Sequence, residues 1–327
     1  MSLLGFGAFG LVTLLITPLG AVLVLAVAGL VIGSAVLADR TGMHRGARTA
    51  RWAGIGIGVL ATLVIGGLSV SSVLPGRLGL GALVGVGPLV GAAIVVGAIL
   101  LGERTLPARS ARQRVGLLAH RGPRTMFPTL AVVVAALSAL ALLTVTIAST
   151  SLASPDDQGR AGRSFAYSVA DPRIGTLSGS RGPFPGSWYT VPVWVALVLL
   201  LAVTAWALVV IVRRRPSDDP ADALLRRRSA AAVLGAAGAG MSIVAIGVGV
   251  VTAAVIGAAG QTAGVNGIHT AIPGASTAVS IALVTALVAA VCLLLGLAMV
   301  LAPALFARRD ARAGRAAAAS RAVEVAR

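Results

Sequence analysis

Long apolar segments separated by short polar ones dominate this chain. Each apolar segment has about twenty residues or more, the length at which a helix crosses a hydrocarbon core of about 30 Å. The pattern predicts membrane-spanning helices at residues 15–38, 53–75, 80–101, 127–150, 191–212, 230–257 and 279–305. We therefore expect an all-α, polytopic membrane helical bundle with about seven transmembrane helices.

The first apolar segment leaves the number of spans open. From Leu3 to Leu37 the chain has no charged residue, which is long for one span and short for two. Pro18 and Gly20 mark a candidate turn. A turn there would give eight spans with both termini inside. We favour one tilted span preceded by a short interfacial segment.

Arginine placement predicts the orientation of the bundle. All 27 residues in the Lys+Arg total are arginine, and 22 of them lie in residues 40–51, 104–124, 213–228 and 308–327. Basic residues in short loops stay in the cytoplasm. We therefore expect the N-terminus outside and the C-terminus in the cytoplasm. The richness in Ala, Gly, Val and Arg is typical of an actinobacterium, so the expected location is a bacterial plasma membrane.

The order of the spans suggests an internal duplication. Spans one to three and five to seven each run in, out, in, and each triplet opens with a proline, Pro18 or Pro192. We read a parallel repeat of a three-helix unit. The predicted parts are a first three-helix unit (1–105), an interfacial segment with the fourth helix and an outer loop (106–190), a second three-helix unit (191–306) and a basic cytoplasmic tail (307–327).

Composition excludes several classes of protein. With 57% hydrophobic and 11% charged residues, the chain has too much apolar surface for a soluble domain. The lack of lysine excludes a retinal Schiff base and a Walker A lysine. All ten acidic residues lie in loops or at span ends, which argues against proton or ion coupling. With one cysteine and no HExxH motif or nucleophile–base pair, we expect no enzyme, no cofactor and no metal site.

Glycine is the most distinctive residue inside the predicted spans. Small residues let helices approach closely in lipid, where packing rather than the hydrophobic effect drives association. The patterns are Gly54, Gly56 and Gly58, then Gly81, Gly85 and Gly91, then Gly235, Gly238 and Gly240. Such surfaces serve either static packing or helices that slide during a functional cycle.

One sizeable outer segment lies between the predicted fourth and fifth spans. Residues 151–190 contain mixed charges, with Asp156, Asp157, Arg160 and Arg163 as the candidate functional residues. The segment is either a small folded cap or a mobile loop. Its charges would gate the bundle, dock a partner, or serve only as a solvated surface.

A forty-residue stretch resembles a known family. At residues 118–157 a basic RGPRT sequence (121–125) enters an apolar helix that ends in SPDD (154–157). This text resembles the start of a repeat in FtsX-like ABC transporter permeases, whose duplicated members have two three-helix units. The resemblance implies a membrane subunit driven by a separate ATP-binding subunit, with a much shorter outer domain than is usual in the family.

The resemblance also implies where such a subunit would dock. In that family the ATPase contacts the inner loop after the first helix of each three-helix unit, here residues 39–51 and 213–229. The partner-docking candidates are Arg40, Arg45, Arg48, Arg213, Arg214, Arg215, Arg226, Arg227 and Arg228. The same arginines suit anionic lipid headgroups better than nucleic acid. Homo- or hetero-oligomers are both compatible with the sequence.

Two functions of different classes follow from these observations. The first is a permease-type subunit without catalysis of its own, which couples a cytoplasmic ATPase to export or to movement of the outer segment. The alternative is a non-transporting membrane scaffold or sensor whose partner docks on the arginine-rich inner loops.

Overall fold

A computed structural model describes residues 45–70, 80–104, 127–172, 175–213, 220–262, 264–265, 268–269 and 271–306. Six helices in these ranges are long and apolar enough to cross a membrane, which confirms the predicted helical membrane bundle. The predicted first span (15–38) and the interfacial segment (106–125) lie outside the described residues. The choice between seven and eight spans therefore stays a prediction.

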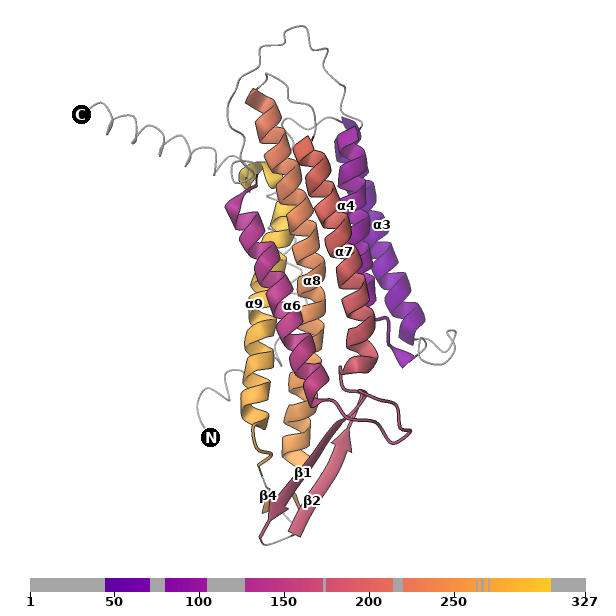
Figure 1. The fold of residues 1–327 in the computed structure, drawn as a ribbon, viewed down its shortest axis with the longest axis vertical. Helices are drawn as coiled ribbons and strands as arrows, with labels where there is room; N and C mark the ends of the chain where they lie inside the picture. The colour runs from indigo at the N-terminus through magenta and orange to yellow at the C-terminus, as the bar shows by residue number, and fades with distance from the viewer. Residues whose placement is uncertain are drawn as a thin grey trace, which may run out of the picture.

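The six helices alternate in direction along the bundle axis (Figure 1). They are α3 (Arg45–Val70), α4 (Val86–Arg104), α6 (Thr129–Leu152), α7 (Ser187–Arg213), α8 (Pro220–Thr262) and α9 (Ala275–Leu301). The first turns of α3, α6 and α8 lie at the same end as the last turns of α4, α7 and α9. We call this the arginine end, after Arg48, Arg51, Arg213 and Arg226–Arg228, and the opposite end the hairpin end.

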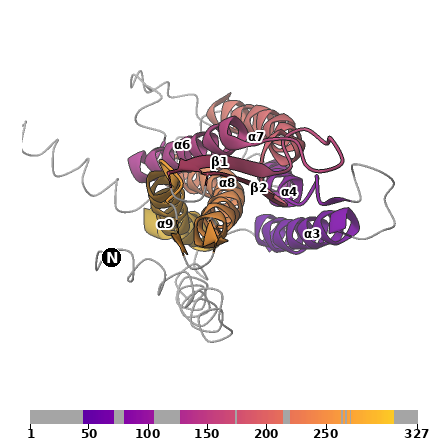
Figure 2. The same ribbon diagram turned by 90° about the horizontal axis from the view of Figure 1, so that it is seen from below.

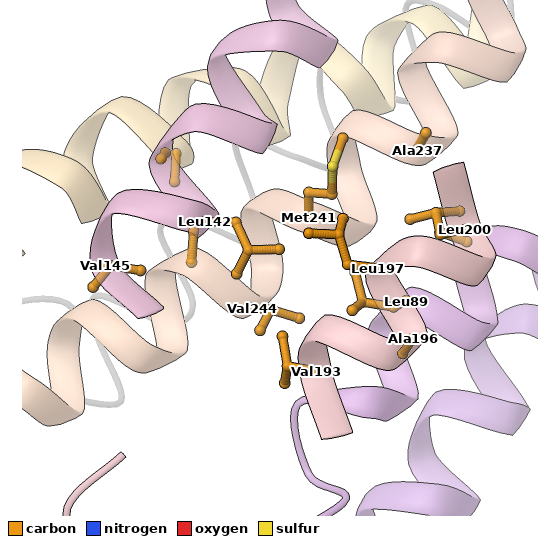
Figure 3. Packing of buried hydrophobic residues seen from close by; sticks show 14 residues of the cluster. Leu89, Leu142, Val145, Val193, Ala196, Leu197, Leu200, Ala237, Met241 and Val244 are labelled. Carbon is orange, nitrogen blue, oxygen red and sulfur yellow. The ribbon is translucent and has the colours of Figure 1, made fainter. Parts of the chain in front are cut away.

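Helix α8 is the central element of the bundle. It packs against α4, α6, α7 and α9, and every residue from 229 to 242 is buried. This stretch consists mainly of Ala, Gly and Ser, and small side chains let four helices approach one axis. Figure 3 shows Met241 and Val244 of α8 between Leu142 of α6 and Leu197 of α7. The core of the bundle thus forms around α8.

Two antiparallel pairs, α3 with α4 and α8 with α9, cross at glycines. A Cβ atom added to Gly58 of α3 would lie 2.6 Å from the carbonyl oxygen of Gly91 in α4. A Cβ added to Gly235 of α8 would lie 2.7 Å from the carbonyl oxygen of Gly296 in α9. Real Cβ atoms do not approach backbone oxygens so closely, so both crossings require glycine. The predicted role of glycine in helix packing is confirmed at these positions.

A small β-sheet interrupts the predicted all-α architecture between α6 and α7. Strand β1 (Phe165–Asp171) pairs antiparallel with β2 (Gly175–Arg181), and the hairpin projects beyond the helices (Figure 1). Phe165 and Val169 are buried while Ala166 and Ala170 are exposed, the two-residue period of a strand. A second, short pair joins β3 (Gly264–Val265) and β4 (Ile268–His269). The expectation of helices alone is wrong here.

The predicted inner loop 213–229 is wrong in its second half. Helix α8 begins at Pro220 and continues without a break to Thr262, so Arg226–Arg228 lie inside the helix. Proline suits the first turn of a helix because its φ is already helical and its missing N–H is not needed there. The following ADALL sequence favours helix. The cluster of arginines marks a helix start rather than a loop.

Candidate arginine-end site

Three polar contacts at the arginine end each join the start of one helix to the end of another. Arg51 of α3 donates from Nη1 to the carbonyl oxygen of Val300 in α9, at 3.3 Å. Arg226 of α8 donates from Nη1 to the carbonyl oxygen of Val212 in α7, also at 3.3 Å. Ser229 of α8 donates from its hydroxyl to the Glu103 carboxylate in α4.

These contacts share one geometric feature. Val300, Val212 and Glu103 are each the penultimate residue of a helix. The last four carbonyl groups of a helix have no partner within it, and that end carries partial negative charge. A guanidinium placed there donates a hydrogen bond to an unpaired carbonyl group and also interacts favourably with the helix dipole. Arg51 and Arg226 are therefore interhelical C-terminal caps of α9 and α7, whereas Ser229 bonds the side chain of Glu103 near the end of α4.

Burial separates the predicted docking arginines into two groups. Arg226 and Arg228 are 4% and 7% exposed, and they face the bundle rather than a partner. We expected both in an exposed loop, and that expectation is wrong because they occupy the second and third turns of α8. Arg48 and Arg227 are half-buried and Arg213 is exposed, so these three lie at the surface of the arginine end.

The remaining docking candidates cannot be placed in the same way. Arg40, Arg214 and Arg215 lie outside the described residues. Arg45 is the first residue of α3, and its side chain is likewise outside the description. Docking by these positions stays a prediction.

Arg51 and Ser229 are structural residues that sequence reasoning missed. Arg51 is 8% exposed although it lies in a basic segment. One signal was available, because Arg51 stands seven residues before Gly58 and Arg228 stands seven residues before Gly235. Both glycines are crossing points, so a buried arginine lies about two turns before the crossing point in α3 and in α8.

The hairpin end holds the other predicted site residues in a folded cap. Asp156 accepts hydrogen bonds at Oδ1 from the backbone N–H groups of Gln158 (3.1 Å) and Arg160 (2.9 Å). Its Oδ2 pairs with Arg160 Nε at 2.7 Å and lies 3.5 Å from Arg163 Nη1. Asp157 accepts from the Ser180 hydroxyl on β2 at 3.4 Å. Of the two predicted states, the folded cap is confirmed.

These contacts shift the titration of Asp156. Desolvation opposes ionisation, but the hydrogen bonds from Arg160 and the Gln158 N–H outweigh it and lower the pKa of Asp156 below its ordinary value of 3.8. The charged form is therefore the one that the cap stabilises.

Arg163 anchors the cap to α7. Its Nε donates to the Tyr189 hydroxyl at 3.3 Å, and its guanidinium lies 5.6 Å from the ring centroid of Trp188. Both aromatic residues belong to the first turn of α7. The charges of the outer segment are thus engaged within the cap, which gives them a structural role.

An aromatic cluster joins the cap to the ends of two other helices. Phe165 and Phe184 stack at a centroid distance of 5.6 Å. They pack with Ile256 and Ala259 of α8 and with apolar residues at the start of α9. The cap therefore holds α7, α8 and α9 together at the hairpin end.

Between the two ends, the bundle interior carries a buried polar pair. Ser138 of α6 and Ser242 of α8 are hydrogen-bonded at 3.0 Å, and both side chains are buried. Among the described residues, no group of three or more His, Cys, Asp and Glu side chains is arranged to hold a metal ion. The charged side chains with described ion pairs or interhelical contacts lie at the arginine end and in the cap, and the bundle interior adds the neutral Ser138–Ser242 pair.

Comparisons with protein-family models, curated proteins and solved structures found no match to this chain.

Proposed function

We propose that the chain is a permease-type membrane subunit that couples a separate cytoplasmic ATPase to movement of the helices. One observation carries this proposal. At the arginine end, the Arg51–Val300 hydrogen bond joins α3 to α9, and the Ser229–Glu103 hydrogen bond joins α8 to α4. A force applied to the start of α3 or α8 therefore reaches both pairs of helices at once.

The glycine crossings support this reading. Gly58 against Gly91 and Gly235 against Gly296 bring two backbones together without interlocking side chains. Such surfaces allow one helix to shift along another more easily than large interdigitated side chains do. The positive-inside rule assigns the arginine end to the cytoplasm, where an ATPase would dock. The resemblance to FtsX-like permeases supplies this class of partner.

The exposed basic residues of the arginine end are the docking surface in this proposal. Arg213 is exposed, and Arg48 and Arg227 are half-buried. Arg48 lies near the start of α3, Arg213 is the last residue of α7, and Arg227 lies near the start of α8. These helices also take part in the interhelical hydrogen bonds of the arginine end. A partner bound there would act directly on α3, α7 and α8.

The alternative, a non-transporting scaffold or sensor, is favoured by the cap. Asp156, Arg160 and Arg163 are tied to one another and to α7, and the Phe165–Phe184 cluster ties the cap to α8 and α9. A cap held on three helices suits a fixed recognition surface. Under this alternative a partner still docks on the arginine end, but ATP hydrolysis is not required.

Purification from the native host tests the proposal. The tagged protein in mild detergent is expected to bring with it a P-loop ATPase with vanadate-sensitive hydrolysis. The double variant Arg213→Gln/Arg227→Gln is expected to lose most of that ATPase. Arg181→Gln, which removes a charge at the hairpin end, is the matched control and is expected to retain it.

Each outcome decides between the two functions. Loss of ATPase in the double variant, with normal elution of the protein and with the control unaffected, supports the permease. A preparation free of ATPase contradicts the permease and favours the scaffold. Equal loss in both variants contradicts docking at the arginine end. Arg226 is left unchanged in this design because its removal would free the Val212 carbonyl and perturb the fold.

A further inference from the structure

The α3–α4 pair and the α8–α9 pair face each other along two interfaces, α4 against α8 and α3 against α9, which we call the α4–α8 seam and the α3–α9 seam. In the α4–α8 seam, a Cβ added to Gly240 of α8 would lie 2.9 Å from the carbonyl oxygen of Pro88 in α4. Gly85, just before α4, lies against Val244 at the same end, and Val96 and Ile99 cluster with Ala232 and Ala236 toward the arginine end, so this seam is closed along α4. The α3–α9 seam is joined at the arginine end by the Arg51 hydrogen bond. Toward the hairpin end α3 diverges from α9 (Figures 1 and 2).

Divergence of α3 and α9 leaves one face of α8 uncovered. Ile243 and Val251 are each 42% exposed, and Gly247 and Ala254 are exposed with them. A Cβ added to Gly247 would have nothing within 4 Å. By contrast, residues 229–242 of the same helix are all buried. We call Ile243, Gly247, Val251 and Ala254 the uncovered face of α8.

Helical geometry places this face in the α3–α9 seam. Ile243 stands seven residues after Ala236, about two turns, and so shares its side of the helix. Ala236 belongs to a cluster that includes Ile55 of α3 and Val300 of α9. Figure 2 shows α8 lying between α9 and α3 on this side. The seam that α3 and α9 close at the arginine end therefore opens onto α8 at the hairpin end.

The α3–α4 pair and the α8–α9 pair correspond to each other, and this correspondence indicates which segment covers the uncovered face of α8. An exchange of α3 with α8 and of α4 with α9 matches Arg51 to Arg228 and Gly58 to Gly235. Under the same exchange, the hydrogen bond of Arg51 from α3 to α9 corresponds to that of Ser229 from α8 to α4. Under this exchange α7, which packs on α4 and α8, corresponds to a segment that packs on α9 and α3.

We propose that residues 15–38 of this chain cover the uncovered face of α8 between α3 and α9. The position before α3 in the sequence corresponds to that of α7 before α8. Six residues, 39–44, connect the segment to α3 at the arginine end and span at most about 22 Å. As a helix the segment would be about 36 Å long, enough to reach the hairpin end.

Side-chain size agrees with this occupant. Helix–helix interfaces in membranes are enriched in small residues, which let backbones approach closely. The uncovered face of α8 presents Gly247 and Ala254 together with Ile243 and Val251, and Gly66 of α3 stands about three turns after Ile55 on the same side. No described atom lies within 4 Å of a Cβ added to Gly247 or Gly66. On α7, the exposed face carries Val198, Leu199 and Trp206 instead. The inference concerns assembly of the bundle and holds for either proposed function.

Disulfide crosslinking in native membranes tests the proposal. The background is the full chain with Cys292→Ala, carrying Gly247→Cys and one further cysteine placed in turn at each of residues 17–27. Within residues 17–27, we expect intramolecular crosslinks to Gly247→Cys at positions that are three or four residues apart. Val198→Cys, on the exposed face of α7, is the matched control and is expected to form none.

Alternative occupants give different products. A crosslinked dimer in place of the intramolecular product would assign the face to a second copy and overturn the proposal. Equal crosslinking to Gly247→Cys and Val198→Cys, or none to either, would also overturn it. A spin label at Val251→Cys adds a measurement that does not depend on disulfide geometry. We expect at least threefold lower oxygen accessibility there than at Val198→Cys, and equal values would show that lipid covers the face.

Discussion

The α4–α8 seam and the α3–α9 seam occupy corresponding places in the bundle but are held in different ways. Along the α4–α8 seam, Gly240 packs on Pro88 and Ala92, and Val96 and Ile99 of α4 cluster with Ala232 and Ala236 of α8 toward the arginine end. The α3–α9 seam has the Arg51 hydrogen bond at one end and diverges beyond it. Packing contacts spread along two helices thus fix their relative direction, whereas a polar contact at one end fixes only a point.

The largest effect is expected from Gly240→Leu, which would break the α4–α8 seam. The new side chain has to enter the space held by Pro88 and Ala92. Overpacking of this kind lowers the free energy of unfolding by about 3 kcal/mol. Thermal unfolding in detergent measures the loss. Gly97→Leu on α4, where a Cβ meets nothing within 4 Å, is the control, and a comparable loss there would contradict the assignment of the seam.

Arg51→Gln is expected to open the α3–α9 seam at its closed end. Loss of a buried hydrogen bond to a charged group costs about 2 kcal/mol, and the Val300 carbonyl loses the Arg51 donor. Spin labels at the arginine ends of α3 and α9 would report a longer and broader distance distribution. Labels on α4 and α8 should not move. Arg48→Gln, in the same helix but half-buried, should leave both distances unchanged.

Ser229→Ala removes the polar contact of the α4–α8 seam. It removes the hydroxyl that donates to Glu103 in α4, but the glycine contacts of the α4–α8 seam remain. The expected loss of stability is about 1 kcal/mol, with no change in helix distance. A double-mutant cycle with Glu103→Gln measures the coupling. A separation of α4 from α8 in Ser229→Ala would show that the polar contact, rather than glycine packing, holds this seam.

The smallest effect on the seams is expected from the cap, which holds the hairpin end of α9 against α8. Because the pKa of Asp156 is lowered in the folded cap, its carboxylate stabilises the cap fully above the ordinary value of 3.8. That contribution is lost as the pH falls through the lower folded-state pKa. Hydrogen exchange of residues 154–164 should therefore accelerate only in strong acid.

Asp156→Asn makes the same test at neutral pH. The variant should be cut by trypsin after Arg160 several-fold faster than the wild type, because the amide cannot pair with both arginines. Asp157→Asn is the matched control, since Asp157 has a single long contact with Ser180. Equal cleavage of the two variants would contradict the proposed role of Asp156.

Hydropathy predicted the helices well and their ends less well. Predicted span 230–257 lies within helix α8 (Pro220–Thr262), but the arginines that suggested a loop belong to the helix. Long arginine side chains extend along a helix end and carry their charge to a neighbouring carbonyl. Charge alone therefore does not mark where a helix begins.

The contacts of the arginine end were harder to predict for a physical reason. Arg51 and Val300 are 249 residues apart, and the acceptor is a backbone oxygen. Every residue has such an oxygen, so the sequence holds no sign of which one is used. The strand pair β1–β2 was missed because β2, GTLSGSR, contains few residues that favour strands. Its alternating partner β1 was the available signal.

The burial of α8 from residue 229 to 242 has a consequence for synthesis of the protein. This stretch of Ala, Gly and Ser gains little from contact with lipid alone, and its neighbours α4, α6 and α7 all precede it in the chain. A ribosome therefore delivers α8 after three of the four helices that enclose it. The order of synthesis thus matches an order in which the bundle can assemble, and α9 packs on α8 last.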